Sequence, residues 1–195
     1  MSASRLTMEG KPLDIVDHTK LLGLIVSSDL TWSRNTQYII KRANSRMELL
    51  RRISSFNAPM KDLVQIYITY IRSILEQSCV IWHSTLTQED CDNLERVQKN
   101  ALRNILKERY ISYEISLNIV QLETLFKRRE KLLYSFGKKS TIIEQTKHQF
   151  KRKETSHSMN TRNTEKYEVI HANTERLRNS TVPYIQRLLN KKESN

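Results

Sequence analysis

The stretch T-K-L-L-G-L-I-V-S-S-D-L-T-W-S-R-N-T, residues 19–36, contains the clearest strand pattern of the chain and then the start of its first helix. Residues 20–26 form a continuous apolar run with one glycine, which is typical of a strand covered on both faces. Residues 12–17 predict a second short strand, joined to the first near residues 17–19. A two-stranded piece is marginal by itself, so we expect it to lie on the helices that follow or on a sheet that this sequence lacks.

Helical periodicity dominates the next hundred residues. Apolar side chains recur every three or four positions, which places each set on one face of a helix. The predicted helices cover residues 33–54, 59–82, 87 to about 105, and 122–136. Pro59 suits a first helical position, and Gly137 suits a C-cap. Thr87 and Asp90 form a variant of the capping box.

The charge of the chain is large and unevenly distributed. The net charge of +12 and the pI near 9.8 indicate a polyanionic partner, since such a surplus repels itself. Residues 1–126 contain 16 Lys and Arg against 14 Asp and Glu, whereas residues 127–195 contain 17 against 7. The first part therefore predicts a nearly balanced folded body, and the second a basic tail. Nucleic acid is the usual partner of this kind, and an anionic membrane surface is the competing one.

The tail loses its periodicity between Lys138 and about Arg176. This polar, basic composition cannot bury enough apolar surface to offset the ordering entropy, so we predict disorder or ordering on binding. A short helix is predicted near residues 181–189. The sequence thus predicts a mainly α, thumb-like helical bundle with a short two-stranded β piece and a basic, largely disordered tail. The predicted divisions are residues 1–32, 33–137 and 138–195.

Several functional classes are disfavoured by composition. The only glycines, Gly10, Gly23 and Gly137, are too far apart for a dinucleotide-binding or phosphate-binding loop. Two cysteines are too few for a disulfide framework, which favours an intracellular location, including the nucleus. No run of about 18 apolar residues predicts a membrane span. Cys79, His83 and Cys91 give three zinc ligands where a structural site needs four, so we expect neither metal nor cofactor.

The block K-L-L-G-L-I-V-S-S-D-L-T-W at residues 20–32 resembles the end of the palm and the start of the thumb in reverse transcriptases of non-LTR (LINE-type) retrotransposons. No single block is diagnostic, but several follow in the order of that family and extend to about residue 190. They are K-R-A-N-S-R-M (41–47), D-L-V-Q-I-Y-I-T-Y-I-R-S-I-L-E (62–76), V-I-W-H (80–83), L-E-R-V-Q-K-N-A-L-R-N-I (94–105), L-E-T-L-F-K-R-R (122–129) and R-L-R-N-S-T-V-P-Y-I-Q-R-L-L-N (176–190).

The resemblance implies a thumb and tail cut from an RNA-directed DNA polymerase, without its catalytic part. Phosphoryl transfer needs clustered Asp carboxylates that hold two metal ions. Asp14, Asp17 and Asp29 have no such setting, so we expect no catalysis by this chain. The first strand would then be the last element of a palm whose other strands are absent.

One variant motif carries a second resemblance. Asn35 and Thr36 stand where many relatives have a histidine, which places the chain in a subset with L-T-W-x-x-N-T. That subset resembles a segment catalogued as the N-terminal domain of AlkB homologue 8. No H-x-[DE] pair begins an iron site, and no glycine loop would hold S-adenosylmethionine. Oxygenase and methyltransferase activities are therefore not expected.

The candidate binding residues are basic. Lys20 and Gly23 match a strand that approaches the primer backbone in the related polymerases, although Gly23 also reads as an ordinary strand glycine. Basic residues recur on two helices and in two dense clusters, where they contact phosphates or form ordinary solvated faces. They are Arg42, Arg46, Arg96, Lys99, Arg103, Lys107, Lys127, Arg128, Arg129, Lys151, Arg152 and Lys153. Trp32 and Trp82 could stack on bases, but core packing is the preferred interpretation.

The sequence therefore predicts a non-catalytic reverse transcriptase fragment that binds RNA or an RNA–DNA hybrid through phosphate contacts, with little sequence preference. The alternative is a helical protein-interaction module or an inert remnant. In that case Tyr67, Tyr70 and the apolar helix faces would serve self-association or docking of the missing palm.

Overall fold

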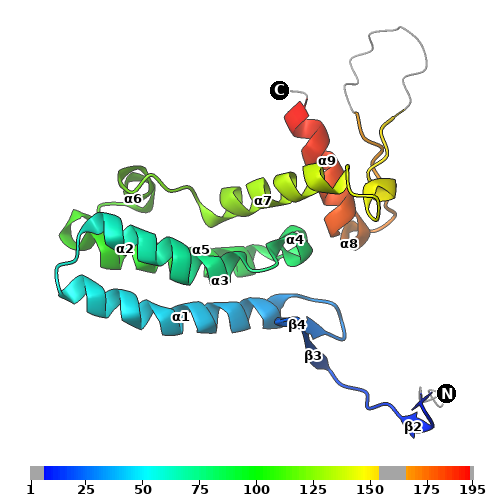
Figure 1. Ribbon diagram of the computed structural model, residues 1–195, viewed down its shortest axis with the longest axis horizontal. Coiled ribbons are helices and arrows are strands. Elements are labelled where there is room, and N and C mark those ends of the chain that lie inside the picture. The colour runs from blue at the N-terminus through cyan, green and yellow to red at the C-terminus, as the bar shows by residue number, and fades with distance from the viewer. Residues whose placement is uncertain (1–6, 154–165, 194–195) are drawn as a thin grey trace, which may run out of the picture.

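The computed structural model describes residues 7–153 and 166–193 and is mainly α-helical, with short antiparallel strands near its N-terminal end (Figure 1). This confirms the predicted fold class. Two hairpins come first: β1 (Thr7–Met8) pairs with β2 (Lys11–Pro12), and β3 (His18–Leu21) pairs with β4 (Leu24–Ser27). The first hairpin stands away from the helical body, whereas the second lies against the start of α1 (Ser33–Ser55).

The apolar run at residues 20–26 is a hairpin and not the single covered strand that its pattern predicted. Strands β3 and β4 are joined by Leu22 and Gly23, which have φ angles of +48° and +85°. Positive φ at both central positions is typical of a type I′ turn, whose twist matches two antiparallel strands. Leu22 at the tip is 92% exposed. An added Cβ on Gly23 would lie 2.9 Å from Nε2 of Gln77.

The other predicted strand also differs from the structure. Of residues 12–17, only Pro12 belongs to a strand. The strand that pairs with β4 is instead His18–Leu21, in the register that sets Lys20 opposite Ile25. The turn at Leu22–Gly23 explains the difference, because it folds the apolar run back on itself and supplies the pairing partner locally.

The helical body is built around α1 and α5 (Gln88–Leu106), which run side by side in the same direction. At one end the Ser33 hydroxyl donates to the Asp90 carboxylate over 2.8 Å, and at the other the Ser54 hydroxyl donates to the Asn104 carbonyl over 2.9 Å. Between these ends, both helices bury the apolar positions that the periodicity predicted. They are Ile39, Ala43, Met47 and Leu50 on α1, and Leu94, Val97, Ala101, Leu102 and Ile105 on α5.

The segment predicted as one helix over residues 59–82 is divided. It contains α2 (Met60–Ile66), the π-helical η1 (Tyr67–Arg72), α3 (Ser73–Glu76) and α4 (Cys79–Trp82), followed by the 3-10 turn η2 (His83–Thr85). The break lies at Ser78, whose φ of +52° is left-handed. Across this break, the Trp82 indole N–H donates to the Gln77 carbonyl over 3.0 Å, and the indole ring is fully buried. Trp82 therefore packs in the core, while Trp32 is half-buried.

The second half of the body begins with the cap that the sequence predicted. The Asp90 N–H donates to the Thr87 hydroxyl over 3.1 Å, and that hydroxyl donates to the Asp90 carboxylate over 2.9 Å. After α5, the turn η3 (Lys107–Arg109) leads to α6 (Tyr113–Ile119), which was not predicted. Helix α7 (Leu125–Ser140) follows the cap residue Thr124 and continues past Gly137, so Gly137 is not the predicted C-cap.

Gly137 instead makes room for the C-terminal helix. After α8 (Glu175–Arg178), helix α9 (Thr181–Glu193) crosses α7 (Figure 1) and includes the short helix predicted at residues 181–189. Gly137 is buried at the crossing, where an added Cβ would overlap Cγ2 of Ile185 and lie 3.4 Å from Cδ1 of Leu189. Ile185 and Leu189 are themselves fully buried, so the crossing is tightly packed.

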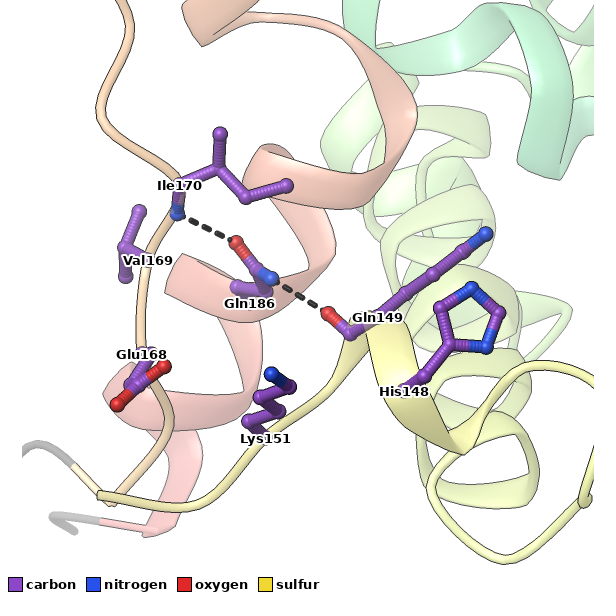
Figure 2. Close-up of a pocket in the computed structure, with 7 residues that line it drawn as sticks. All are labelled: His148, Gln149, Lys151, Glu168, Val169, Ile170 and Gln186. Atoms are coloured by element: carbon purple, nitrogen blue, oxygen red, sulfur yellow. Dashed lines mark hydrogen bonds between the residues drawn. The ribbon is translucent and has the colours of Figure 1, made fainter. Parts of the chain in front are cut away.

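Side-chain amides of α9 hold the backbone of two preceding segments. Gln186 accepts from the Ile170 N–H over 2.9 Å and donates to the Gln149 carbonyl over 2.6 Å (Figure 2). One turn further along the helix, Asn190 accepts from the Tyr167 N–H over 2.9 Å and donates to the Tyr167 carbonyl over 3.0 Å. Both amides are almost completely buried, so these bonds fix the two segments against α9.

Parts of the tail therefore differ from the prediction of disorder. Phe150, after the turn η4 (Lys147–Gln149), is 5% exposed and Tyr167 is 3% exposed. These isolated aromatic residues and the amides of α9 order a segment whose average composition is polar. The difference concerns the described residues 138–153 and 166–176. Residues 154–165, also covered by that prediction, lie outside the described residues.

Arg129 of α7 was predicted to contact nucleic acid and is instead buried in the core. Its side chain has no exposed surface; Nε donates to Nδ1 of His83 over 3.2 Å, and the guanidinium lies 5.7 Å from the ring centre of Trp82. Burial, together with this neighbouring cation, lowers the pKa of His83 to about 3, so the imidazole is neutral and accepts the bond. The prediction for Arg129 is wrong, because a guanidinium without exposed surface cannot reach a phosphate.

Replacing Gly137 by alanine is expected to destabilise the folded chain, because the new methyl group overlaps Ile185. Overpacking of this kind costs about 1–3 kcal/mol, and the better helix propensity of alanine offsets up to about 1 kcal/mol. Denaturant unfolding measures the difference, with Ser135→Ala at an exposed position of α7 as the control. In an Ile185→Ala background the cost should fall, and an equal cost in both backgrounds would contradict the contact.

The neutral state of His83 predicts a loss of stability in mild acid. Its pKa is about 3 in the folded chain and near 6.5 when unfolded, so unfolding takes up a proton below pH 6.5. The contribution of neutral His83 to the free energy of unfolding is complete above pH 6.5. It declines as the pH falls, by at most about 1.4 kcal/mol per pH unit. Denaturant unfolding at several pH values between 7 and 5 should show this slope. His83→Gln, which keeps an acceptor for Arg129, should remove it, and equal slopes would mean that folded His83 is protonated.

Candidate nucleic-acid interface

Three cations and two tyrosines form a surface beside the first half of α1. We name it the α1 basic face, and it consists of Lys20, Tyr38, Arg42, Arg46 and Tyr70. Tyr38, Arg42 and Arg46 are spaced four residues apart on α1, so they share one side of the helix. Lys20 reaches this side from β3, and Tyr70 reaches it from η1.

Each cation of the α1 basic face contacts a tyrosine ring. Lys20 Nζ and the Arg42 guanidinium lie 5.1 Å and 5.5 Å from the ring centre of Tyr38. The Arg46 guanidinium lies 4.4 Å from the ring centre of Tyr70 and also donates to its hydroxyl. Lys20 donates to the Tyr38 hydroxyl over 3.0 Å. Because cations are attracted to the faces of aromatic rings, the rings hold these charged groups in defined positions at the surface.

The charges of the α1 basic face are not neutralised by carboxylates. Within the described residues its three cations form no ion pair. Arg51 and Arg52, at the other end of α1, both pair with Glu48, at 3.4 Å and 3.3 Å. The hydrogen bond from Lys20 and the nearby charges of Lys20 and Arg42 lower the pKa of the Tyr38 hydroxyl. The face therefore presents a positive potential to solvent.

The side chain of Gln77 links the β3–β4 hairpin to this face. Its Oε1 accepts from Nη1 of Arg42 over 3.0 Å, and its Nε2 lies beside Gly23 in the hairpin turn. Asn35 of α1 accepts from the Ile25 N–H over 3.1 Å and fixes β4 as well. Gly23, expected to admit a phosphate along a strand, instead forms the turn and the contact with Gln77. The hairpin is thereby held against α1.

The basic residues predicted on α5 lie apart from the α1 basic face. Arg96 of α5 is exposed and faces the other flank of α1, where it lines a groove between α1 and α5. Lys99 lies 5.0 Å from the ring centre of Tyr113, and Arg103 lies 5.2 Å from that of Tyr110. Arg96, Lys99 and Arg103 therefore lie on α5 and do not join the α1 set as one surface.

Lys107 has a structural contact. Its Nζ donates to the Ser54 carbonyl over 2.7 Å, within the last turn of α1. Lysine side chains commonly satisfy such terminal carbonyls and interact favourably with the helix dipole. Lys107 therefore caps the C-terminal end of α1, opposite to the hairpin.

Most of the basic residues predicted at the start of α7 form contacts within the protein. Lys127 is exposed and forms no ion pair within the described residues. Nε of Arg128 pairs with Oε1 of Glu76 at 3.2 Å, and Arg129 is buried as described above. Of this predicted cluster, only Lys127 has its charge available to a ligand.

The second predicted cluster, Lys151, Arg152 and Lys153, is exposed. Its backbone pairs with residues 166–168: the Lys153 N–H donates to the Lys166 carbonyl, and the Glu168 N–H donates to the Lys151 carbonyl. Lys151 and Glu168 also line a pocket of about 260 Å³ (Figure 2). Because that pocket contains a carboxylate, it is less suited to a polyanion than the α1 basic face.

The cysteines and histidine considered as zinc ligands do not form a metal site. Within the described residues no group of three His, Cys, Asp or Glu side chains is arranged to hold a metal ion. Cys79 is buried, and its burial raises the pKa of the thiol to about 11, which favours the protonated form. His83 is occupied by Arg129.

The tyrosines of the α1 basic face were not identified as binding residues from the sequence. Tyr70 was assigned to self-association, and Tyr38 was not singled out. The spacing of Tyr38 four residues before Arg42 was an available signal, since side chains at that spacing meet on a helix. The contact of Tyr70 with Arg46 joins residues 24 positions apart and has no local signal.

Comparisons with known proteins identify no relative. No protein-family model matches the chain, and neither the curated proteins nor the solved structures contain a match. In the described part of the chain, no helix has both the length and the apolar character needed to cross a bilayer.

Proposed function

We propose that the chain binds RNA or an RNA–DNA duplex through phosphate contacts on the α1 basic face. The observation that carries this proposal is the set of three cations that are held on tyrosine rings and form no ion pair with any described carboxylate. A cation that is already paired must break its pair to bind phosphate. An unpaired one releases counterions from the nucleic acid, which is the main source of sequence-independent affinity.

The chemistry of the face favours the nucleic-acid backbone over the bases. Arg42 and Arg46 carry planar guanidinium groups, which match the oxygen geometry of phosphate. Phosphate contacts fix position and carry no sequence information. We therefore expect similar affinity for different sequences of the same secondary structure.

The order of sequence blocks supports a thumb-like role within a non-LTR reverse transcriptase. The resemblance implies primer contact at the segment of Lys20, and this residue belongs to the α1 basic face. We propose that the chain is a non-catalytic fragment of such an enzyme, and that a palm carrying the catalytic carboxylates is its natural partner. Polymerisation would then take place on the palm, while this chain holds the template and primer.

The salt dependence of RNA binding tests this function. With ~3 phosphates neutralised, one for each cation of the α1 basic face, log affinity should fall against log salt with a slope of roughly −2.1 to −2.7. Arg42→Ala/Arg46→Ala should weaken binding to a labelled RNA hairpin ~10–100-fold and make the slope shallower by roughly 1.4–1.8. Fluorescence anisotropy across a salt series measures both quantities.

The matched control is Arg51→Ala/Arg52→Ala. It removes the same charge from the same helix, but from residues that pair with Glu48. Its effect should be much smaller. Equal losses in the two double variants would show that net charge alone, and not the α1 basic face, determines binding. No binding by the unaltered chain at low salt would refute the proposed function.

A second candidate function is self-association through the N-terminal hairpins and the segment between them. Ile15 and Leu22 are 85% and 92% exposed, and such exposed apolar side chains favour association. This function predicts assembly that rises with protein concentration and scarcely changes with salt. Sedimentation velocity would detect it, and Ile15→Ser/Leu22→Ser should abolish it. A chain that stays monomeric at all concentrations would exclude self-association as this function.

A further inference from the structure

A surface groove runs along the junction of α1 and α5, on the flank of α1 that lies away from the α1 basic face. It has a volume of about 460 Å³, within the range of small-ligand sites. We name it the α1–α5 groove and define it by Ile40, Lys41 and Asn44 of α1 and Asn93, Arg96 and Val97 of α5. None of the residues that line it is acidic.

The polar groups of the groove lie on both walls. Lys41 and Arg96 give one exposed cation from each helix, and neither forms an ion pair within the described residues. The carboxamides of Asn44 and Asn93, also one from each helix, make no side-chain hydrogen bond within the described chain. Each carboxamide therefore has a donor and an acceptor to offer a ligand.

Two branched apolar side chains also line the groove. Val97 is buried and Ile40 is partly buried against the core. A ligand that matches all three features has a flat apolar surface, a hydrogen-bonding edge and a negative charge. A nucleotide has this combination in its base face, base edge and phosphate.

We propose that the α1–α5 groove binds one unpaired nucleotide of a single-stranded segment. Its phosphate would contact Lys41 and Arg96, and its base would pack on Ile40, beside the buried Val97, with its edge toward Asn44 and Asn93. Asparagine carboxamides read base edges by paired hydrogen bonds, and single-stranded RNA is recognised mainly through such splayed bases. This inference rests on the proposed function, in which the backbone of an adjoining duplex lies on the α1 basic face.

The α1 basic face and the α1–α5 groove lie on the two flanks of α1, so the width of one helix separates them. An α-helix with its side chains is about 10–12 Å across, so a short single strand leaving a duplex on one flank of α1 can reach the other. The preferred ligand is therefore a duplex with a single-stranded extension, and not a duplex with flush ends.

Three labelled RNA hairpins test the inference: one with a flush end, one with a three-nucleotide overhang, and one whose overhang lacks bases. The unaltered chain should bind the overhang hairpin about tenfold more tightly than the flush one, as expected for one base held by paired hydrogen bonds. The overhang without bases should lose most of that gain. Asn44→Leu/Asn93→Leu should remove the gain while leaving the flush hairpin unaffected, and circular dichroism confirms that this variant folds.

The outcomes separate this inference from the proposed function. If the unaltered chain binds all three hairpins equally, or if Asn44→Leu/Asn93→Leu keeps the gain, the groove does not bind a base and the proposed function stands. If Arg42→Ala/Arg46→Ala weakens binding of all three hairpins and keeps the gain from the overhang, the duplex lies on the α1 basic face and the extension lies in the groove, as proposed. If the unaltered chain binds none of them at low salt, both proposals are refuted.

Discussion

The packing of α1 on α5 is the contact on which the rest of the structure depends. Its buried stripe runs the length of α1 and is anchored at both ends by hydroxyls, from Ser33 to Asp90 and from Ser54 to the Asn104 carbonyl. Burial of each large apolar side chain in this stripe contributes about 1.5–3 kcal/mol. The stripe also divides the remaining surface of α1 into two flanks. One carries the α1 basic face and the other opens into the α1–α5 groove, so one helix positions both candidate sites.

A contact between an arginine and an aromatic ring has opposite consequences at the surface and in the core. Arg42 and Arg46 lie against tyrosines at the surface, where water screens their mutual repulsion and the charges remain accessible. Arg129 lies against Trp82 in the core, where its Nη1 and Nη2 atoms have no hydrogen-bond partner in the structure. Burial lowers the pKa of Arg129 and keeps His83 neutral. Solvent access, and not the ring beneath the cation, decides whether the charge can serve binding.

The parts of the fold that were predicted correctly are those with a local cause. The buried stripes of α1 and α5 follow from helical periodicity, and the cap at Thr87 follows from two residues three positions apart. The hairpin at Leu22–Gly23 was missed, because a continuous apolar run has no period that separates one strand from two. The roles of Gly137 and Arg129 depend on helices distant in sequence. The candidate site divides in the same way. Lys20, Arg42 and Arg46 were predicted singly, but their tyrosine partners, and the absence of an ion pair to any described residue, became visible only in three dimensions.

The bonds from Gln186 and Asn190 have a consequence for how the chain can vary. They join main-chain atoms of residues 149, 167 and 170 and make no use of the side chains at 168 and 169. Hydrogen bonds to main-chain atoms depend on the path of the backbone. They do not depend on which side chains most residues along it carry. Substitutions at 168 and 169 are therefore compatible with the attachment, whereas proline at 167 or 170 would remove a required N–H. The segment is constrained in shape while its composition can drift, so related chains could keep this arrangement with little sequence similarity there.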